Sequence, residues 1–306
     1  MARYLARRLL HSLLVLAAIM AVTFVVFQVL GDPVRRILPL NASDEQVEAF
    51  SQANGFSDPF PTRFARFVGD VVTLDFDDSY TLRRDPLPAV LDALPRTAIL
   101  AGAAFALAAV GGVALGVAAA VNRGGRIDRG VSTAGVVVVS MAEFWIGLIL
   151  VVLFAVHLGW LPTSGYGTGT RLVLPAVTLA VTPMGRIAYF TRNSVVAALD
   201  EPHVAFATSL GMPRSVVLGR YVLPGASLPL LALAGVELTR MLVGGALVVE
   251  LVFAWPGSGR LYATAMERYD LPLVTAAILV ATVIVLVLNL LLDLLYARID
   301  PRVRLA

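Results

Sequence analysis

The ionisable side chains of this chain offer little covalent chemistry. Cysteine is absent and the 24 basic residues other than histidine are all arginine, which excludes thiol nucleophiles, thiolate metal sites, Schiff-base lysines and a phosphate-loop lysine. The three histidines are scattered without ligand spacing, at His11, His157 and His203. We therefore expect no catalytic residue, no cofactor-binding site and no metal site in this chain.

Charged side chains within apolar stretches are the residues most able to act on a passing solute. Glu143, Arg240 and Glu250 are of this kind, and each should face water or an opposite charge because an ionised group is costly inside a bilayer. Glu143 either lines a wet translocation pathway or pairs with Arg240, and the sequence favours neither. Glu237 lies three residues before Arg240 and can pair with it on one helix. Glu250 is either a carboxylate that caps the following loop or a part of an outer gate.

The elements that carry these residues are predicted to be membrane helices. Of the 306 residues 58% are apolar and 15% are charged, and the mean hydropathy is +0.82, as is typical of a polytopic membrane protein. We predict six α-helical spans, over residues 9–30, 97–121, 131–156, 172–189, 228–254 and 272–296. The close run Gly111, Gly112 and Gly116 places the second span inside a bundle, because small residues let helices approach closely.

A long polar stretch separates the first two spans and predicts a small subdomain outside the membrane. The chain then divides into 1–30 with the first span, 31–96 with this subdomain, and 97–306 with the other five spans. The arginines of the short loops gather at both termini, in 122–130 and around 200–224. By the positive-inside rule these segments face the cytoplasm, and so do both termini. The basic balance thus controls topology and does not indicate a nucleic-acid partner.

The segment 200–224 is too broken to cross a membrane and yet has a defined pattern. Pro202 can begin a helix and Gly211 can end it, after which Met212 and Pro213 lead into another. Between them four side chains follow the i, i+3, i+4, i+7 spacing of one helical stripe: His203, Phe206, Ala207 and Leu210. So short a helix is marginal alone in water, and we expect its stripe to be buried against a soluble partner or against its own bundle.

Several short motifs along almost the whole chain resemble one family. They are Gly31-Asp32-Pro33, Leu94-Pro95-Arg96-Thr97, Ser140 to Gly147, Leu158 to Tyr166, Glu250 to Gly257, and Asn289 to Asp293 with Asp300-Pro301-Arg302. In this order and spacing they are similar to the permease subunits of binding-protein-dependent ATP-binding-cassette (ABC) importers, within the branch for dipeptides, oligopeptides and nickel. Two positions depart from that branch: Ala142 stands where proline is usual, and residues 74–80 replace a glycine-bracketed tag.

The resemblance extends to the cytoplasmic signature of these permeases. Ala207, Gly211 and Leu223-Pro224 match it, while Ala205, Phe206 and Tyr221 replace its glutamate, first alanine and isoleucine. The resemblance implies an all-α type I importer permease whose segment 200–224 couples to an ATPase through His203, Phe206, Ala207, Leu210, Gly211 and Met212. It also implies a second permease subunit, two ATPase subunits that hold ATP and Mg, and an external solute-binding protein, in a bacterial inner membrane.

The resemblance implies import of peptides, with nickel or another small solute as the alternative. A sodium- or proton-coupled secondary transporter is a rival of a different class, but it should show inverted repeats, and none is visible in the sequence. A membrane enzyme would need a cluster of His, Asp, Ser or Cys near the interface, which the sequence does not display.

Overall fold

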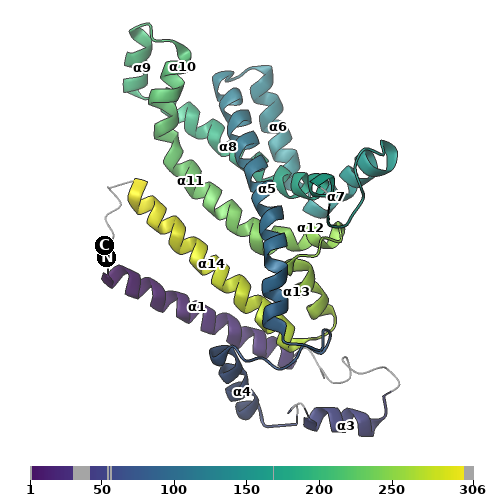
Figure 1. The fold of residues 1–306 in the computed structure, drawn as a ribbon. Helices are drawn as coiled ribbons and strands as arrows, with labels where there is room; N and C mark the ends of the chain where they lie inside the picture. The colour runs from purple at the N-terminus through teal and green to yellow at the C-terminus, as the bar shows by residue number, and fades with distance from the viewer. Residues whose placement is uncertain (1, 30–41, 54, 56, 168, 300–306) are drawn as a thin grey trace. The chain divides into compact units, whose positions relative to one another are not determined.

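The computed structural model describes residues 2–29, 42–53, 55, 57–167 and 169–299, and these are mostly helical (Figure 1). The motifs at 31–33 and 300–302 lie outside the described residues. The helices before the second predicted span are α1 (Ala2–Val29), α3 (Asp44–Ala53) and α4 (Phe60–Thr73). The second span belongs to α5 (Pro86–Val121), which begins well before residue 97.

Five of the described helices are long and apolar enough to cross a membrane, or six if one bent pair counts as a span. The bent pair is α6 (Arg126–Ser140) with α7 (Glu143–Leu150) and its π-helical continuation η1 (Val151–His157). It turns by 106°. The predicted third span over 131–156 thus corresponds to a bent helix pair, because Met141 and Ala142 adopt extended backbone angles that end α6.

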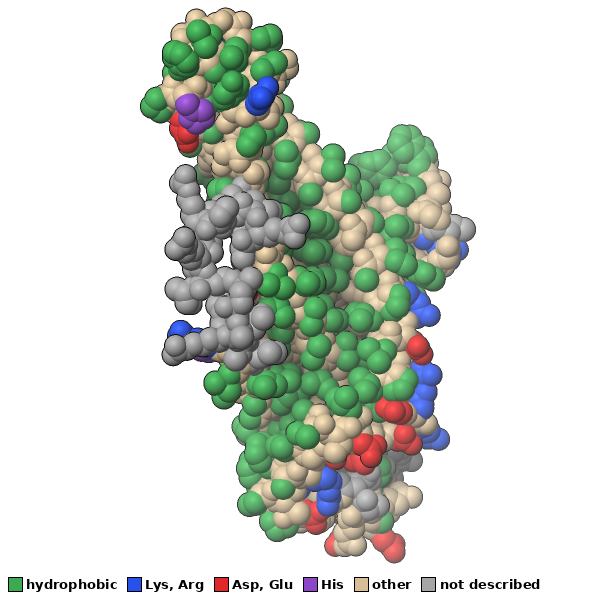
Figure 2. Space-filling view, turned by 60° about the vertical axis from the view of Figure 1, so that its left-hand side comes forward, with side chains coloured by type: hydrophobic (Ala, Val, Ile, Leu, Met, Phe, Trp, Pro, Cys, Tyr) green, Lys and Arg blue, Asp and Glu red, His purple; other side chains and the backbone are tan. Residues whose placement is uncertain are grey.

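The remaining chain follows in the order α8 (Gly169–Leu199), α9 (Pro202–Ser209), α10 (Arg214–Val217) and the π-helical η2 (Leu218–Val222). After them come α11 (Leu223–Arg240), the π-helical η3 (Met241–Gly245) and α12 (Ala246–Val252), which form one unbroken rod. The last helices are α13 (Ser258–Glu267) and α14 (Leu271–Ile299). Apolar side chains cover much of the visible surface, as a lipid-facing exterior requires (Figure 2).

The described residues form two compact units. The first contains the chain up to Pro95 together with Gly257–Val287. Its apolar core joins side chains of α1, α4, α13 and the start of α14, Phe24 and Leu273 among them. Buried Asp270 accepts hydrogen bonds from the Ser79 hydroxyl at 2.6 Å, the Thr81 N–H at 2.8 Å and the Leu273 N–H at 3.2 Å. This carboxylate attaches the loop after α4 to the first turn of α14.

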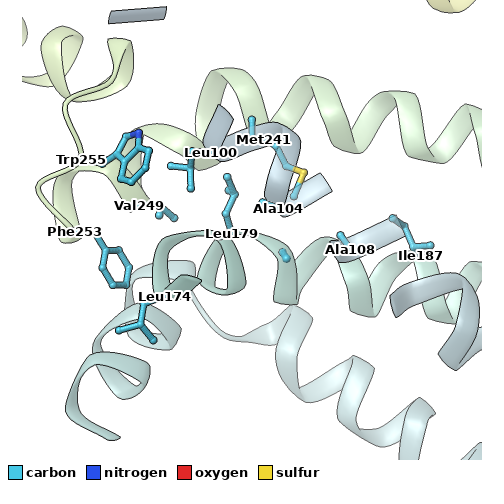
Figure 3. Close-up of a cluster of buried hydrophobic side chains, with 13 residues drawn as sticks. Leu100, Ala104, Ala108, Leu174, Leu179, Ile187, Met241, Val249, Phe253 and Trp255 are labelled. Atoms are coloured by element: carbon cyan, nitrogen blue, oxygen red, sulfur yellow. The ribbon is translucent and has the colours of Figure 1, made fainter. Parts of the chain in front are cut away.

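The second unit contains Arg96–Pro256 and the end of α14 from Leu288. Helices α6, α7 and α11 pack on α8, and Figure 3 shows the buried core of this unit, which includes Leu179 and Phe253. Helix α5 approaches α8 closely, since a Cβ at Gly116 would lie 2.5 Å from the Ala188 carbonyl oxygen. The expectation that the glycines of this span permit close helix contact is thus confirmed.

Candidate functional site

A cluster of four charged side chains joins α7, α8 and α11 in the second unit. Glu237 on α11 is fully buried, and Arg186 on α8 donates to both of its oxygens, from Nε at 2.7 Å and from Nη2 at 2.8 Å. Such a bidentate guanidinium–carboxylate pair is the strongest arrangement available to these groups. The other two members of this charge cluster are Arg240 and Glu143.

Arg240 and Glu143 occupy the edges of the charge cluster. The Arg240 Nη1 atom lies 3.6 Å from Glu237 Oε1, which is an ion-pair distance but not a hydrogen bond. Glu143 begins α7, where the helix N-terminus favours a carboxylate, and it interacts electrostatically with Arg186 and Glu237. Among the described residues no ion pair joins Glu143 to Arg240, so the interpretation that these two pair directly is wrong. Glu237 takes that place because it is on the same helix as Arg240.

Arg186 is the member of the charge cluster that the sequence analysis missed. It lies in α8 within an apolar stretch that also carries two prolines, Pro175 and Pro183. A lone arginine inside a predicted span was a usable signal, because such a cation needs a carboxylate from another span. The sequence could not show which carboxylate that would be.

A second cluster, here called the Glu250 cluster, brings together three of the motifs that resemble the family. Fully buried Glu250 accepts a hydrogen bond from the Thr97 hydroxyl at 2.6 Å, which links α12 to α5. The Trp255 indole N–H donates to the Arg96 carbonyl at 3.0 Å, and Arg96 Nη1 donates to the Pro256 carbonyl at 3.2 Å. The motifs around 94–97 and 250–257 are thus held together in space.

The motif around 158–166 joins the same Glu250 cluster. The Tyr166 ring meets the Trp255 ring edge to face at 4.9 Å, and the Arg96 guanidinium lies 5.7 Å from the centre of the Tyr166 ring. The Gly165 N–H donates to the Phe253 carbonyl at 2.9 Å. The chain can make this turn because Ala254 adopts a left-handed conformation with φ of 50°. Whether the Glu250 cluster works as a gate stays a prediction.

The segment 200–224 forms the predicted pair of short helices, α9 and α10, with Gly211 between them at a φ of 76°. In Figure 1 they lie beside the start of α11. Val204 and Ala207 are buried against Val195 and Val222, whereas Phe206 and Leu210 are 65% and 60% exposed. The stripe is thus divided between two faces, because Ala207 faces the bundle and the larger side chains face outward, and burial of Phe206 and Leu210 against a partner stays a prediction. His203 is exposed too, 3.1 Å from Glu201, and Met212 packs beside the buried residues.

An ion pair that the sequence analysis missed holds the neighbouring loop in place. Asp128 at the start of α6 accepts two hydrogen bonds from Arg192 of α8, both at 2.9 Å, and one from the Gly124 N–H at 2.8 Å. This carboxylate joins the loop between α5 and α6 to the last turns of α8, close in sequence to α9.

The ionisable groups outside the spans with shifted pKa values include Asp70 in α4 and Tyr80 in the loop between α4 and α5. Burial raises the pKa of Asp70 above its ordinary value, and the nearby carboxylate of Asp77 raises it further. Burial likewise raises the pKa of Tyr80, with a further contribution from Asp77. Within the part of the chain that the structure describes, no three His, Asp or Glu side chains are grouped as ligands for a metal ion.

Comparisons with known proteins cover the whole chain. Residues 112–305 match the family described as "Binding-protein-dependent transport system inner membrane component", and residues 1–101 match its N-terminal companion. The oligopeptide transport system permease protein AppB of Bacillus subtilis is 31% identical, with 99% of each chain covered. The glutathione transport system permease protein GsiC of Pectobacterium atrosepticum is 33% identical, again with 99% of each chain covered.

Two solved structures share the fold. Chains from the MetNI methionine ABC transporter in inward-facing conformations and from an amino acid ABC transporter crystallised with histidines give TM-scores of 0.59 and 0.55. Each match covers 69% of this chain, and it covers 96% of the first and 94% of the second transporter chain. At 18% and 20% sequence identity these likenesses are limited to the fold.

Proposed function

The chain belongs to the family of inner membrane components of binding-protein-dependent transport systems, and from this premise we propose that it forms half of the pathway of an ATP-driven peptide importer. The observation that carries the proposal is similarity over 99% of both chains to permeases named for oligopeptides and glutathione. The solute would be a short peptide delivered by an external binding protein. A second permease subunit would supply the other half of the pathway.

The proposed coupling element is α9. Its buried face, Val204 and Ala207, attaches it to α8 and η2, so that a displacement of α9 must move the ends of those helices. Its other face presents Phe206 and Leu210, which would seat in a groove of an ATPase subunit as an amphipathic helix does. His203, Gly211 and Met212 would complete this contact, with Gly211 providing the turn that only glycine adopts cheaply.

The proposed topology has six spans, with the bent α6–α7 pair as the third and both termini in the cytoplasm. The region between α1 and α5 would then form a subdomain outside the membrane. ATP and Mg would bind to the two partner ATPases, and no hydrolysis would occur on this chain. ATP binding would close the ATPases and, through α9, turn the pathway from inward-open to outward-open. The Glu250 cluster would close the pathway on the outer side.

The experiment that tests this function is uptake of radiolabelled trialanine by proteoliposomes that contain both permeases, both ATPases and the binding protein. We expect ATP-dependent uptake by the native assembly. Phe206→Asp and Leu210→Asp should each reduce uptake at least tenfold, because a buried carboxylate at an apolar contact is costly. The matched control is Leu74→Asp, which places the same charge at an exposed leucine elsewhere.

Two results would contradict the proposal. Uptake that persists without ATP would indicate a secondary transporter. Full uptake by Phe206→Asp, with the ATPases co-purifying at undiminished yield, would show that α9 does not couple to them.

A further inference from the structure

The charge cluster has two guanidinium groups and two carboxylates, and one of its guanidinium groups, that of Arg240, makes an ion-pair contact but no hydrogen bond within the described residues. Both oxygens of Glu237 accept hydrogen bonds from Arg186, so that the carboxylate has its strongest interactions with that guanidinium. Arg240 stays 3.6 Å away from it and, among the residues that the structure describes, has no hydrogen bond. Its guanidinium therefore keeps five donors available for another acceptor.

An exposed arginine is unusual at the position that Arg240 occupies. It lies in the middle of the apolar stretch Pro229–Val252, which is long enough to span a membrane, and its side chain is 62% exposed. Its neighbours on the surface are small or apolar: Val236 is 48% exposed and Val243 is 41% exposed. Glu237 contacts only one side of this guanidinium. A cation that faces lipid at this depth is costly, so the exposed part of Arg240 must face water or a further anion.

Glu143 does not neutralise Arg240. Its carboxylate lies beside Gly245, where a Cβ would come 3.3 Å from Glu143 Oε2 and 3.7 Å from the Arg240 carbonyl oxygen, and among the described residues it makes no ion pair with the Arg240 guanidinium. The charges that act on Glu143 are those of Arg186 and Glu237. The surface around Arg240 thus combines exposed apolar side chains with one exposed guanidinium.

We propose that Arg240 binds the carboxylate of the solute as it passes the middle of the membrane, an inference that rests on the proposed function. Every unmodified peptide ends in a carboxylate, whatever its side chains, and a guanidinium can bind it through two parallel hydrogen bonds. Glu237 lies near enough to compete for Arg240 electrostatically. This competition weakens the contact, which a transporter needs if the solute is to leave again.

The test compares trialanine with trialanine amide, which lacks the carboxylate, in the reconstituted importer. Native protein and the variants Arg240→Gln and Arg240→Lys are measured with both peptides. The control is Arg129→Gln, since Arg129 is outside the charge cluster and donates to the Gly124 carbonyl. The measured quantity is the ratio of trialanine uptake to trialanine amide uptake. Any preference of the binding protein for one peptide affects this ratio equally in native and variant importers, so it cancels when the two are compared.

We expect Arg240→Gln to lower the free-acid to amide ratio roughly tenfold, as the loss of a charge-assisted hydrogen bond predicts. The ratio for Arg240→Lys should stay close to that of the native protein, and the ratio for Arg129→Gln should equal it. A second measurement omits the binding protein: trialanine at millimolar concentration should raise the Tm of the native assembly and not that of Arg240→Gln.

An unchanged ratio together with an unchanged Tm response would overturn the inference. Equal loss of both peptides in Arg240→Gln, with loss of the second permease on purification, would also overturn it, because Arg240 would then pair with a carboxylate of that subunit. Neither result affects the proposed function, which is tested separately by the ATP dependence of trialanine uptake and by Phe206→Asp.

Discussion

Two fully buried carboxylates on the continuous rod α11–η3–α12 are held in different ways. Glu237 is bound by two hydrogen bonds from a guanidinium and lies near a second one. Glu250 accepts a hydrogen bond from the neutral Thr97 hydroxyl, in a cluster that also contains Arg96, Tyr166 and Trp255. The Glu237 carboxylate thus joins α11 to α8 through a guanidinium, whereas the Glu250 carboxylate joins α12 to α5 through a hydroxyl group beside a turn.

Removal of the Glu237 carboxylate should have the largest effect. Glu237→Ala leaves Arg186 without its partner inside the bundle, and we expect a loss of about 3–5 kcal/mol of stability, because one partner of a buried pair is left uncompensated. The measurement is the Tm of the purified permease in detergent. The double variant Glu237→Leu with Arg186→Met should recover most of the loss, since both charges are then gone. A Tm for Glu237→Ala equal to that of the native protein would refute the importance of this pair.

A smaller effect is expected at the other carboxylate. Thr97→Val keeps the shape of the side chain but removes the hydroxyl that donates to Glu250, and the loss of a hydrogen bond to a charged group costs about 1.5–3 kcal/mol. Thr97→Ser retains the donor and serves as the control, with a Tm close to native. If Thr97→Val were as harmful as Glu237→Ala, the distinction between the two carboxylates would be lost.

The smallest effect concerns the ring that covers the Glu250 cluster. Trp255→Phe keeps an aromatic side chain against Tyr166 but loses the indole N–H that donates to the Arg96 carbonyl. We expect a destabilisation of about 0.5–1.5 kcal/mol, the net value of one neutral hydrogen bond. The matched control is Trp160→Phe, which changes a tryptophan that is 70% exposed. An equal fall in Tm for both variants would argue against a specific role of the Trp255 N–H.

The two regions also differ in how far their sequence predicted them. The Glu250 cluster consists of residues from motifs that resemble the family, and the family membership is confirmed. The charge cluster contains Arg186, for which no motif gave a sign. Motifs report contacts that recur in a family, whereas a charge pair of one chain requires knowledge of which helices are neighbours.

Proline and glycine positions in the sequence predicted one feature of the backbone and missed another. Pro202 and Gly211 placed α9 correctly, because proline and glycine restrict or permit specific backbone angles. The bend before Glu143 has no such signal, since Met141 and Ala142 are compatible with a helix. The division of the stripe, with Ala207 buried and Phe206 exposed, was not predictable from spacing, because a helix of two turns can bury either side.

The amino-acid sequence by itself determined the membrane character of the chain, its apolar stretches, its family and the ends of α9, since hydropathy and the restrictions of proline and glycine act locally. Only the tertiary structure decided that Glu237 pairs with Arg186, that Glu250 bonds to Thr97 and that Arg240 stays exposed. These outcomes depend on which helices pack together, and burial then makes each choice of partner costly to change.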